Sequence, residues 1–294
     1  MTRVTLALTL LLAATLPSAP ASAQAPLPEV NAPSYPPAEL DRIVSPIALY
    51  PDPLLAQVLA AATYPDDIPD AARWADGHRY LTGHGLAVAI DDDRVPWDPS
   101  VQALLPFPSV LDMMARDMPW TQELGDAVLA ERADVMDAVQ RMRHQAWTFG
   151  YLRSNANVIV NNGAYIEILP VGADVIAVPV YDPRIVFAAP RRGVVVVGTA
   201  IRFSSRVTLG VAFTPWGWGA TRFAWPSHTV IINRTPWART WANRRTYVHP
   251  FEIRRDASQR PVERHELRPK EDRQRNARHG DDRRRGSDHD RDRD

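Results

Sequence analysis

The stretch DPLLAQVLAAAT occupies residues 52–63. Proline is tolerated in the first turn of a helix, and aspartate is a favoured residue at the N-cap position before it. We therefore expect Asp52 to cap a helix that runs over residues 54–63. Because this helix is rich in alanine and leucine and has no polar face, the pattern predicts that it is buried.

Further helical patterns follow this stretch. Residues 65–67 (PDD) open a second helix, and Ser109 with Asp112 resembles the capping box that begins a helix. The longest helix is expected at about residues 120–147, with Glu131, Arg132, Arg141 and Arg143 mostly facing water. Its inward stripe has helical spacing and comprises Leu124, Val128, Val135, Val139, Met142 and Ala146. These patterns predict an all-helical domain over residues 40–148.

The periodicity changes to two after this domain. Residues 158–160 and 165–168 flank Asn161-Asn162-Gly163, and an Asn-Gly pair is a strong signal for a β-hairpin because both residues tolerate positive φ. Four further strands are predicted at residues 175–178, 194–197, 207–213 and 229–232. The sequence therefore predicts an α+β protein, with a β-rich region at residues 149–251 after the helical domain.

The two ends of the chain differ from its centre. Residues 1–23 have a basic start, an apolar run and a small-residue end, so we expect an export signal that is cleaved after about Ala23. Residues 24–39 form a Pro-rich linker. Residues 252–294 alternate acidic and basic side chains with few apolar ones, which predicts a disordered charged tail. The chain is thus expected to work in the bacterial periplasm or cell envelope.

Charge is distributed unevenly, although the formal net charge is zero. Residues 24–190 contain 22 acidic and 10 basic residues, whereas residues 191–251 contain nine arginines and no acid. The sequence has no cysteine, which excludes disulfides, thiol catalysis and thiolate metal sites. Lys270 in the tail is the only lysine, so the folded part has no phosphate-loop or Schiff-base lysine.

Candidate catalytic groups are sparse. Glu123 lies beside Trp120 near the start of the longest helix, and a carboxyl in an apolar pocket is what a cell-wall hydrolase needs for general acid catalysis. Acidic residues in the first turn of a helix are also explained by the helix dipole alone. A carboxylate-dependent peptidoglycan hydrolase is therefore kept as the alternative function, and no catalytic residue is assigned.

Two clusters resemble metal sites only in part. The run 91–93 (DDD) has the acidic start of a calcium loop but lacks its glycine and its final glutamate, so a solvated turn is expected. Asp76, His78 and His84 surround a glycine-containing loop without the fixed spacing of a zinc helix. We expect no metal ion and no cofactor.

The acid-free segment is the best candidate for binding. It combines its arginines with Trp216, Trp218 and Trp225, and rings beside cations suit a polyanion, a glycan or an anionic membrane surface. Arg222 lies between these tryptophans. Two other interpretations stay open: the rings belong to a core, or the basic segment docks on the acidic helical domain. Nucleic acid is not an expected partner outside the cytoplasm.

Five stretches resemble the bacterial exported proteins known as domain of unknown function 3300. They are residues 43–59 (IVSPIALYPDPLLAQVL), 102–111 (QALLPFPSVL), 120–126 (WTQELGD), 133–143 (ADVMDAVQRMR) and 178–183 (VPVYDP). The resemblance covers about residues 40–190. It implies an exported helical module followed by a strand, and it carries no catalytic residues.

Tyr50 and Tyr181 belong to two turns of this resemblance, Tyr-Pro-Asp-Pro and Tyr-Asp-Pro, and both are candidate binding residues. The turns also have a structural explanation, because aspartate caps helices and proline fixes φ. Taken together, the sequence predicts a non-enzymatic envelope protein that binds an envelope polymer, a membrane surface or a partner protein.

Overall fold

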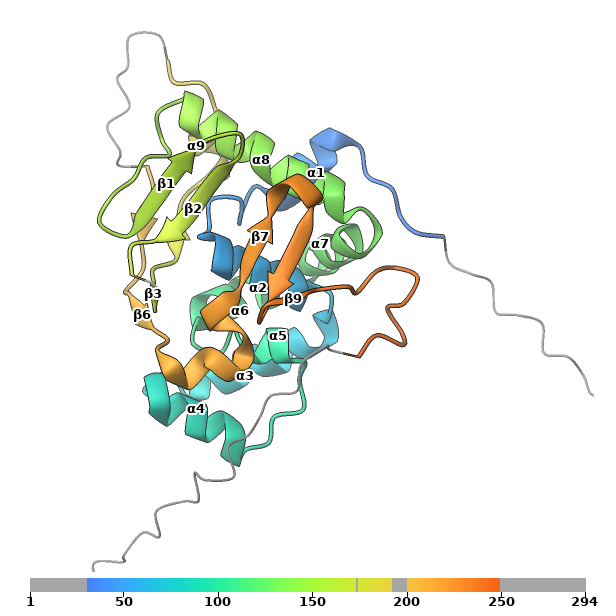
Figure 1. The fold of residues 1–294 in the computed structure, drawn as a ribbon, viewed down its shortest axis with the longest axis vertical. Coiled ribbons are helices and arrows are strands. Elements are labelled where there is room, and N and C mark those ends of the chain that lie inside the picture. Colours follow the sequence, from blue (N-terminus) through green and yellow to red (C-terminus); the bar gives the residue numbers. More distant parts are fainter. Residues whose placement is uncertain (1–30, 173, 192–199, 249–294) are drawn as a thin grey trace, which may run out of the picture. The chain divides into compact units, whose positions relative to one another are not determined.

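The computed structural model describes residues 31–172, 174–191 and 200–248. Helices occupy the first part of these residues and short antiparallel strands occupy the second, so the predicted α+β class is confirmed (Figure 1). The predicted export signal, the strand at 194–197 and the charged tail at 252–294 lie outside the described residues.

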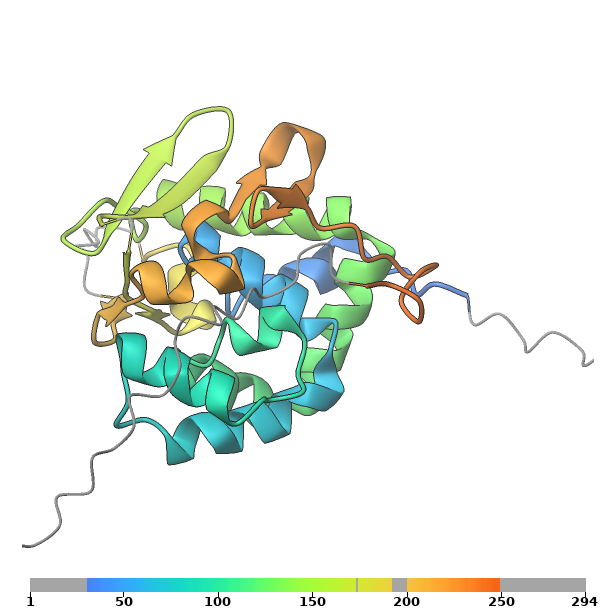
Figure 2. The same ribbon diagram turned by 60° about the horizontal axis from the view of Figure 1, so that its bottom comes forward.

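The helical part surrounds helix α2. Its elements are α1 (Pro37–Val44), α2 (Asp52–Ala62), the 3₁₀ helix η1 (Pro65–Asp67), α3 (Ile68–Gly77), α4 (Gly83–Asp92), α5 (Pro99–Gln102), α6 (Pro108–Arg116), α7 (Met118–Ala130) and α8 (Arg132–Thr148). Every residue of α2 except Pro53 is buried, which confirms the predicted buried helix. Figure 2 shows α3 and α4 on the side of the helical part opposite the first hairpin.

The longest predicted helix is wrong in one respect, because it is divided between α7 and α8. Glu131 has non-helical torsions (φ −138°, ψ 50°) between them. The carbonyl of Leu129, which a continuous helix would use internally, accepts a hydrogen bond from the backbone N–H of Trp241 at 2.8 Å. The predicted inward stripe is nonetheless buried throughout both helices.

The predicted start of α6 is also wrong. The helix begins at Pro108, and Ser109 lies inside its first turn without acting as a cap. Proline takes this position readily because its missing N–H would have had no partner there.

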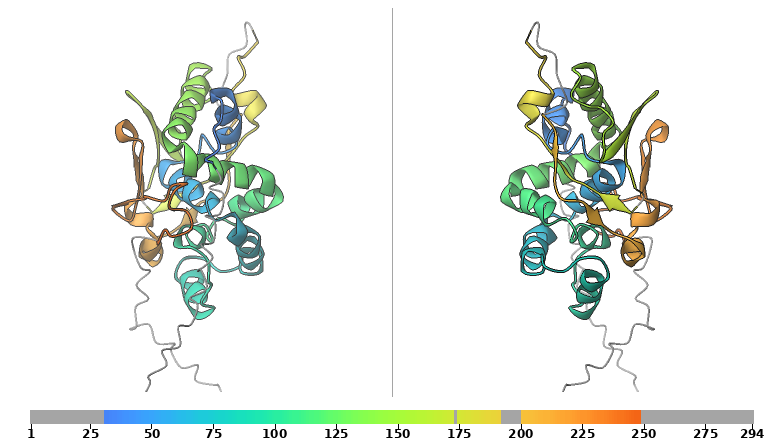
Figure 3. Two further views of the ribbon diagram at one scale, coloured as in Figure 1. Left: turned by 90° about the vertical axis from the view of Figure 1, so that its right-hand side faces the viewer. Right: turned by 90° about the vertical axis from the view of Figure 1, so that its left-hand side faces the viewer.

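The strands begin with the predicted hairpin, which is confirmed. Strand β1 (Val158–Asn162) pairs with β2 (Ile166–Pro170), with Val160 opposite Ile168. The remaining elements are β3 (Val175–Ile176), β4 (Pro179–Val180), α9 (Pro183–Val186), β5 (Arg202–Phe203), β6 (Val207–Thr208), η2 (Val211–Trp216), η3 (Trp218–Ala220), β7 (Arg222–Ala224), η4 (Trp225–Ser227), β8 (Thr229–Ile232) and β9 (Thr235–Pro236). Figure 3 shows the β1–β2 hairpin and the β7–β8–β9 sheet on the same side of the helices.

Two predicted strands are shorter than expected, whereas the strand predicted at 229–232 is confirmed as β8. The strand expected at 175–178 stops at Ile176 as β3. The strand expected at 207–213 stops at Thr208 as β6. Gly210 then adopts a positive φ of 57°, and the chain continues as the 3₁₀ helix η2, which buries Phe213 and Trp216. Glycine permits this reversal without steric cost, so the alternating pattern is interrupted there.

A buried ion pair connects two helices of the helical part. The guanidinium of Arg143 on α8 lies 2.7 Å from the carboxylate of Asp52 on α2, and both side chains are almost fully buried. Two predictions are therefore wrong: Arg143 does not face water, and Asp52 is the first residue of α2 rather than its cap, because Pro51 occupies the N-cap position. Burial raises the pKa of Asp52, and the nearby Arg143 opposes this rise.

We predict that Arg143→Met lowers the free energy of unfolding by about 3–5 kcal/mol, because it leaves a buried carboxylate without its cation. The matched control is Arg141→Met, two residues earlier on the same helix, whose partner Asp41 is 2.7 Å distant at the surface. The control is expected to cost about 0–1 kcal/mol. Urea unfolding measures both; equal losses would contradict the structural role given to Arg143.

Candidate functional site

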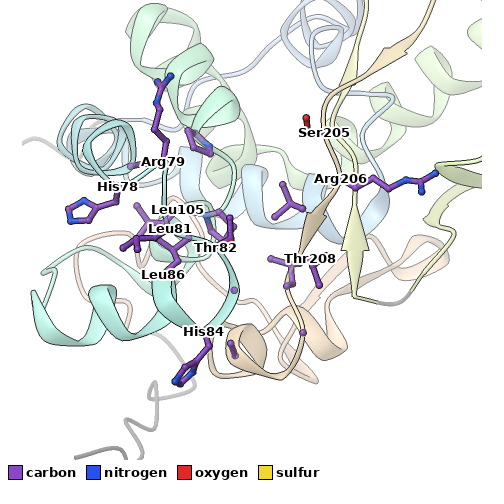
Figure 4. A pocket seen from close by; sticks show the side chains of 18 of the residues that line it. His78, Arg79, Leu81, Thr82, His84, Leu86, Leu105, Ser205, Arg206 and Thr208 are labelled. Carbon is purple, nitrogen blue, oxygen red and sulfur yellow. The ribbon is translucent and has the colours of Figure 1, made fainter. Parts of the chain in front are cut away.

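An apolar groove opens between the helical part and the segment that follows β5. Three stretches line it: the end of α3 with the start of α4 (residues 75–86), the turn before α6 (residues 105–108), and residues 205–212 around β6. The cavity measures about 590 Å³, within the usual range for ligand pockets. Figure 4 shows β6 facing the turn that carries Leu81 and Thr82 across this space.

The inner surface of the groove is aliphatic. Leu86, Leu105 and Leu209 are buried beneath it, and the partly exposed Leu81 and Val207 form its walls. Val211 on the lining is 90% exposed, and Tyr80 beside the lining is 75% exposed. Large apolar side chains this exposed and grouped around a cavity are typical of an interaction site.

The ionisable side chains that line the groove are all basic, namely His78, Arg79, His84 and Arg206. Arg79 forms an ion pair with Asp76, and Nε2 of His78 lies 3.8 Å from the carboxylate of Asp93. Arg206 instead binds neutral acceptors, the side-chain oxygen of Asn157 at 3.1 Å and the carbonyl of Ala156 at 2.9 Å. The groove is therefore an apolar surface with a cationic border.

His78 is held by aromatic stacking at this border. Its ring lies 3.9 Å from that of Trp74 at an interplanar angle of 18°. Nδ1 of His78 lies 2.8 Å from the carbonyl oxygen of Trp74; because a carbonyl only accepts, Nδ1 is the donor. The indole N–H of Trp74 in turn donates to Asp93 at 2.7 Å. These contacts fix His78 as part of a packed surface cluster.

The two partial metal motifs do not assemble into a metal site. Within residues 31–172, 174–191 and 200–248, no three His, Cys, Asp or Glu side chains come close enough to hold an ion. The expected turn at 91–93 is the C-terminal end of α4, where Asp93 occupies the C-cap position and its carboxylate binds Trp74.

Glu123, Tyr50 and Tyr181 do not line the groove. Glu123 forms an ion pair with Arg42 at the surface. The hydroxyl of Tyr181 donates to the carbonyl of Ser45 at 2.9 Å and accepts from the N–H of Leu49 at 3.2 Å. Burial raises the pKa of both tyrosines, so both hydroxyls stay protonated. The contacts of Tyr181 give it a structural role, in which it holds the chain before α2.

The three candidate tryptophans lie in the core, and each indole N–H donates within the protein. Trp216 donates to the side chain of Gln102 at 2.9 Å, Trp218 to the carbonyl of Ala103 at 3.0 Å, and Trp225 to Asp52 at 3.3 Å. Their exposed fractions are 2%, 7% and 2%, whereas Arg222 is exposed. The three rings are therefore packed in the core, as one of the open interpretations had it. Ligand binding by these tryptophans stays a prediction.

The groove itself was missed by the sequence reasoning. Its residues are ordinary aliphatic ones from three distant stretches, and no motif connects them. One signal was present: Val207, Leu209 and Val211 alternate with polar or small residues, which indicates a strand with one face left open.

The fold and the groove together define an α+β protein with a helical core and an open apolar cavity. A family model described as "Protein of unknown function (DUF3300)" matches residues 36–260, and the chain belongs to this family. It is 34% identical to "Uncharacterized protein YacH" of Escherichia coli (strain K12), over 57% of this chain and 33% of that protein. The chain thus spans about a third of the length of this relative.

No solved structure matches the chain. Among the described residues, no helix is both long enough and apolar enough to cross a membrane.

We predict that Trp216→Phe lowers the free energy of unfolding by about 1–3 kcal/mol, because the buried oxygen of Gln102 loses its donor. Arg222→Ala, at an exposed position of the same basic segment, is expected to stay within about 0.5 kcal/mol of the parent protein. Urea unfolding followed by far-UV circular dichroism compares them. A loss at Arg222 as large as that at Trp216 would contradict this assignment of core and surface.

Proposed function

We propose that this chain works outside the cytoplasm, in the bacterial cell envelope, as a binding protein whose ligand site is the apolar groove. The observation that carries the proposal is a cavity of about 590 Å³ with an aliphatic floor and only basic ionisable side chains in its lining. Such a site favours an apolar ligand that carries negative charge. The export signal expected at residues 1–23 supports the location.

The same geometry favours binding over the alternative, peptidoglycan hydrolysis. Glycoside hydrolysis uses two carboxyl groups on either side of the scissile bond. No aspartate or glutamate lines the groove, and the candidate Glu123 forms an ion pair with Arg42 instead of lying in an apolar pocket. The hydroxyls that line the groove belong to Thr82, Ser205 and Thr208, and the side-chain hydrogen bonds of histidine in the described part of the chain go to Trp74 and Asp137 instead. This arrangement suits recognition of a ligand.

We predict that Leu81→Asp weakens binding of the anionic apolar dye 8-anilinonaphthalene-1-sulfonate at least tenfold. The substitution removes one apolar wall, worth about 1.5–3 kcal/mol when covered, and adds a charge that repels the sulfonate. The control is Ile185→Asp on α9, because Ile185 is 51% exposed and does not line the groove. Dye titration followed by fluorescence measures both; equal affinities for the two variants would reject the groove as the site.

We further predict that the full-length chain, expressed in a Gram-negative bacterium, is recovered by osmotic shock with a new N-terminus near Gln24. Mass spectrometry of the released protein gives the cleavage point. Retention in the cytoplasm with residues 1–23 intact would reject the location while leaving the groove to be tested by the dye.

A further inference from the structure

The strand at the groove has one occupied edge. Strand β6 pairs antiparallel with β3, with Thr208 opposite Val175 and Val207 opposite Ile176. The N–H of Leu209 donates to the carbonyl of Asp174 at 2.8 Å. In an antiparallel pair, the backbone groups of successive residues alternate between the partner and the opposite edge. Val207 and Leu209 therefore face β3, and Thr208 faces away from it.

The opposite edge of β6 borders the groove. Residues 205–212 line the groove, but no residue of β3 does, so the cavity lies on the side of β6 that is away from β3. Figure 4 shows Thr208 of β6 across this space from the turn that carries Leu81 and Thr82. Within the part of the chain that the structure describes, the backbone N–H and C=O of Thr208 have no backbone partner. The groove thus combines an aliphatic floor with an open strand edge.

We infer that the groove binds an extended polypeptide segment of a partner protein, which adds to β6 as a third strand. This inference rests on the proposed function and names the ligand class of the same site. Strand addition supplies main-chain hydrogen bonds to an open edge, while alternate side chains fill adjacent pockets. Here the N–H and C=O of Thr208 give the hydrogen bonds, and Leu81, Leu86 and Leu105 receive the side chains.

A hydrocarbon chain fits the groove less well. An acyl chain laid along β6 would cover the backbone groups of Thr208 without offering them a partner. Each buried unsatisfied group is unfavourable, whereas a peptide strand satisfies these groups while it covers the same apolar surface. The open edge therefore decides between two ligands that the aliphatic floor alone would accept.

The charges around the groove indicate the composition of the segment. Alternate apolar residues would face the floor, because side chains of a strand alternate between its two faces. Among the described residues, His84 and Arg206 have no carboxylate within ion-pair distance, so acidic residues in the segment would complement this border. A second copy is disfavoured because antiparallel pairing with Thr208 opposite Thr208 would place the uncharged Gly210 opposite Arg206. Residues 205–212 contain no acidic residue, so a second β6 would not complement this border.

The test uses the full chain and a labelled eight-residue peptide in which valine alternates with glutamate and threonine. Fluorescence anisotropy is expected to show saturable binding. Thr208→Pro is expected to weaken this binding at least tenfold, because proline removes the N–H that faces the groove. The bonds to β3 are kept, since Thr208 does not face that strand. The matched control Thr208→Val keeps the N–H and should bind within about threefold of the parent protein.

A second peptide with the same side chains, N-methylated at alternate residues along its binding edge, is expected not to bind. Equal binding of the methylated peptide, or equal binding by Thr208→Pro, would overturn strand addition. A dimer that sedimentation detects without peptide, and that Thr208→Pro abolishes, would overturn the partner segment in favour of a second copy.

The dye separates this inference from the proposed function. The parent protein could bind 8-anilinonaphthalene-1-sulfonate, lose this binding on Leu81→Asp, and yet not bind the peptide. In that case the polypeptide ligand is rejected and the binding groove stands. If neither probe binds, both are rejected. Far-UV circular dichroism and the urea unfolding midpoint show whether Thr208→Pro is folded. If it is not folded, Thr208→Val decides the point, because failure of that variant to bind the peptide would reject the assigned edge.

Discussion

The guanidinium of Arg143 is the contact on which the rest of the fold depends. It donates to the carbonyls of Ala48, Tyr50 and Ile166 at 2.8–3.0 Å and forms the ion pair with Asp52. These acceptors belong to the chain before α2 and to strand β2, and Arg143 itself belongs to α8. A single buried cation thus joins three elements that are far apart in the sequence. Because desolvating such a pair is unfavourable, its geometry must be satisfied completely, which fixes one arrangement of these elements.

Other arginines, in the basic segment and in the helical part, make contacts of the same kind. Arg239 stacks over Tyr64 at 3.6 Å and donates to the carbonyl of Thr63 at 2.7 Å. In the helical part, Arg132 lies 4.5 Å from the ring of Trp237 and donates to the carbonyl of that residue. Guanidinium groups suit these positions because they stack on rings and offer several donors in one plane. These arginine side chains therefore hold the acid-free segment against the acidic helical part. Docking of the basic segment on the helical domain was one of the interpretations that the sequence left open.

The sequence predicted what depends on local pattern. The buried helix α2, the hairpin turn at Asn161-Asn162-Gly163 and strand β8 follow from spacing and turn chemistry, and the structure has all three. The sequence could not predict what depends on distant partners. Arg143 lies two residues after Arg141, on a different side of α8. Arg141 pairs with Asp41 at the surface, whereas Arg143 is buried against Asp52, a partner about 90 residues earlier that helical spacing does not reveal. The break at Glu131 likewise depends on Trp241, about 110 residues later.

The groove could not be predicted from the sequence either, because its lining comes from distant stretches of the chain and contains no motif. Tryptophans beside arginines indicated a binding surface, but Trp225 donates to Asp52 and stacks 4.4 Å from Phe223 inside the core. The rings stabilise the scaffold, and the open surface is left to aliphatic residues that carry no motif. Strand β6 pairs over only two residues, and so short a two-stranded ribbon is marginally stable by itself. A third strand supplied by a ligand would add hydrogen bonds and apolar contacts to β6. Because the helical core already holds β6 in place, the binding of this ligand would require little loss of conformational entropy in the protein.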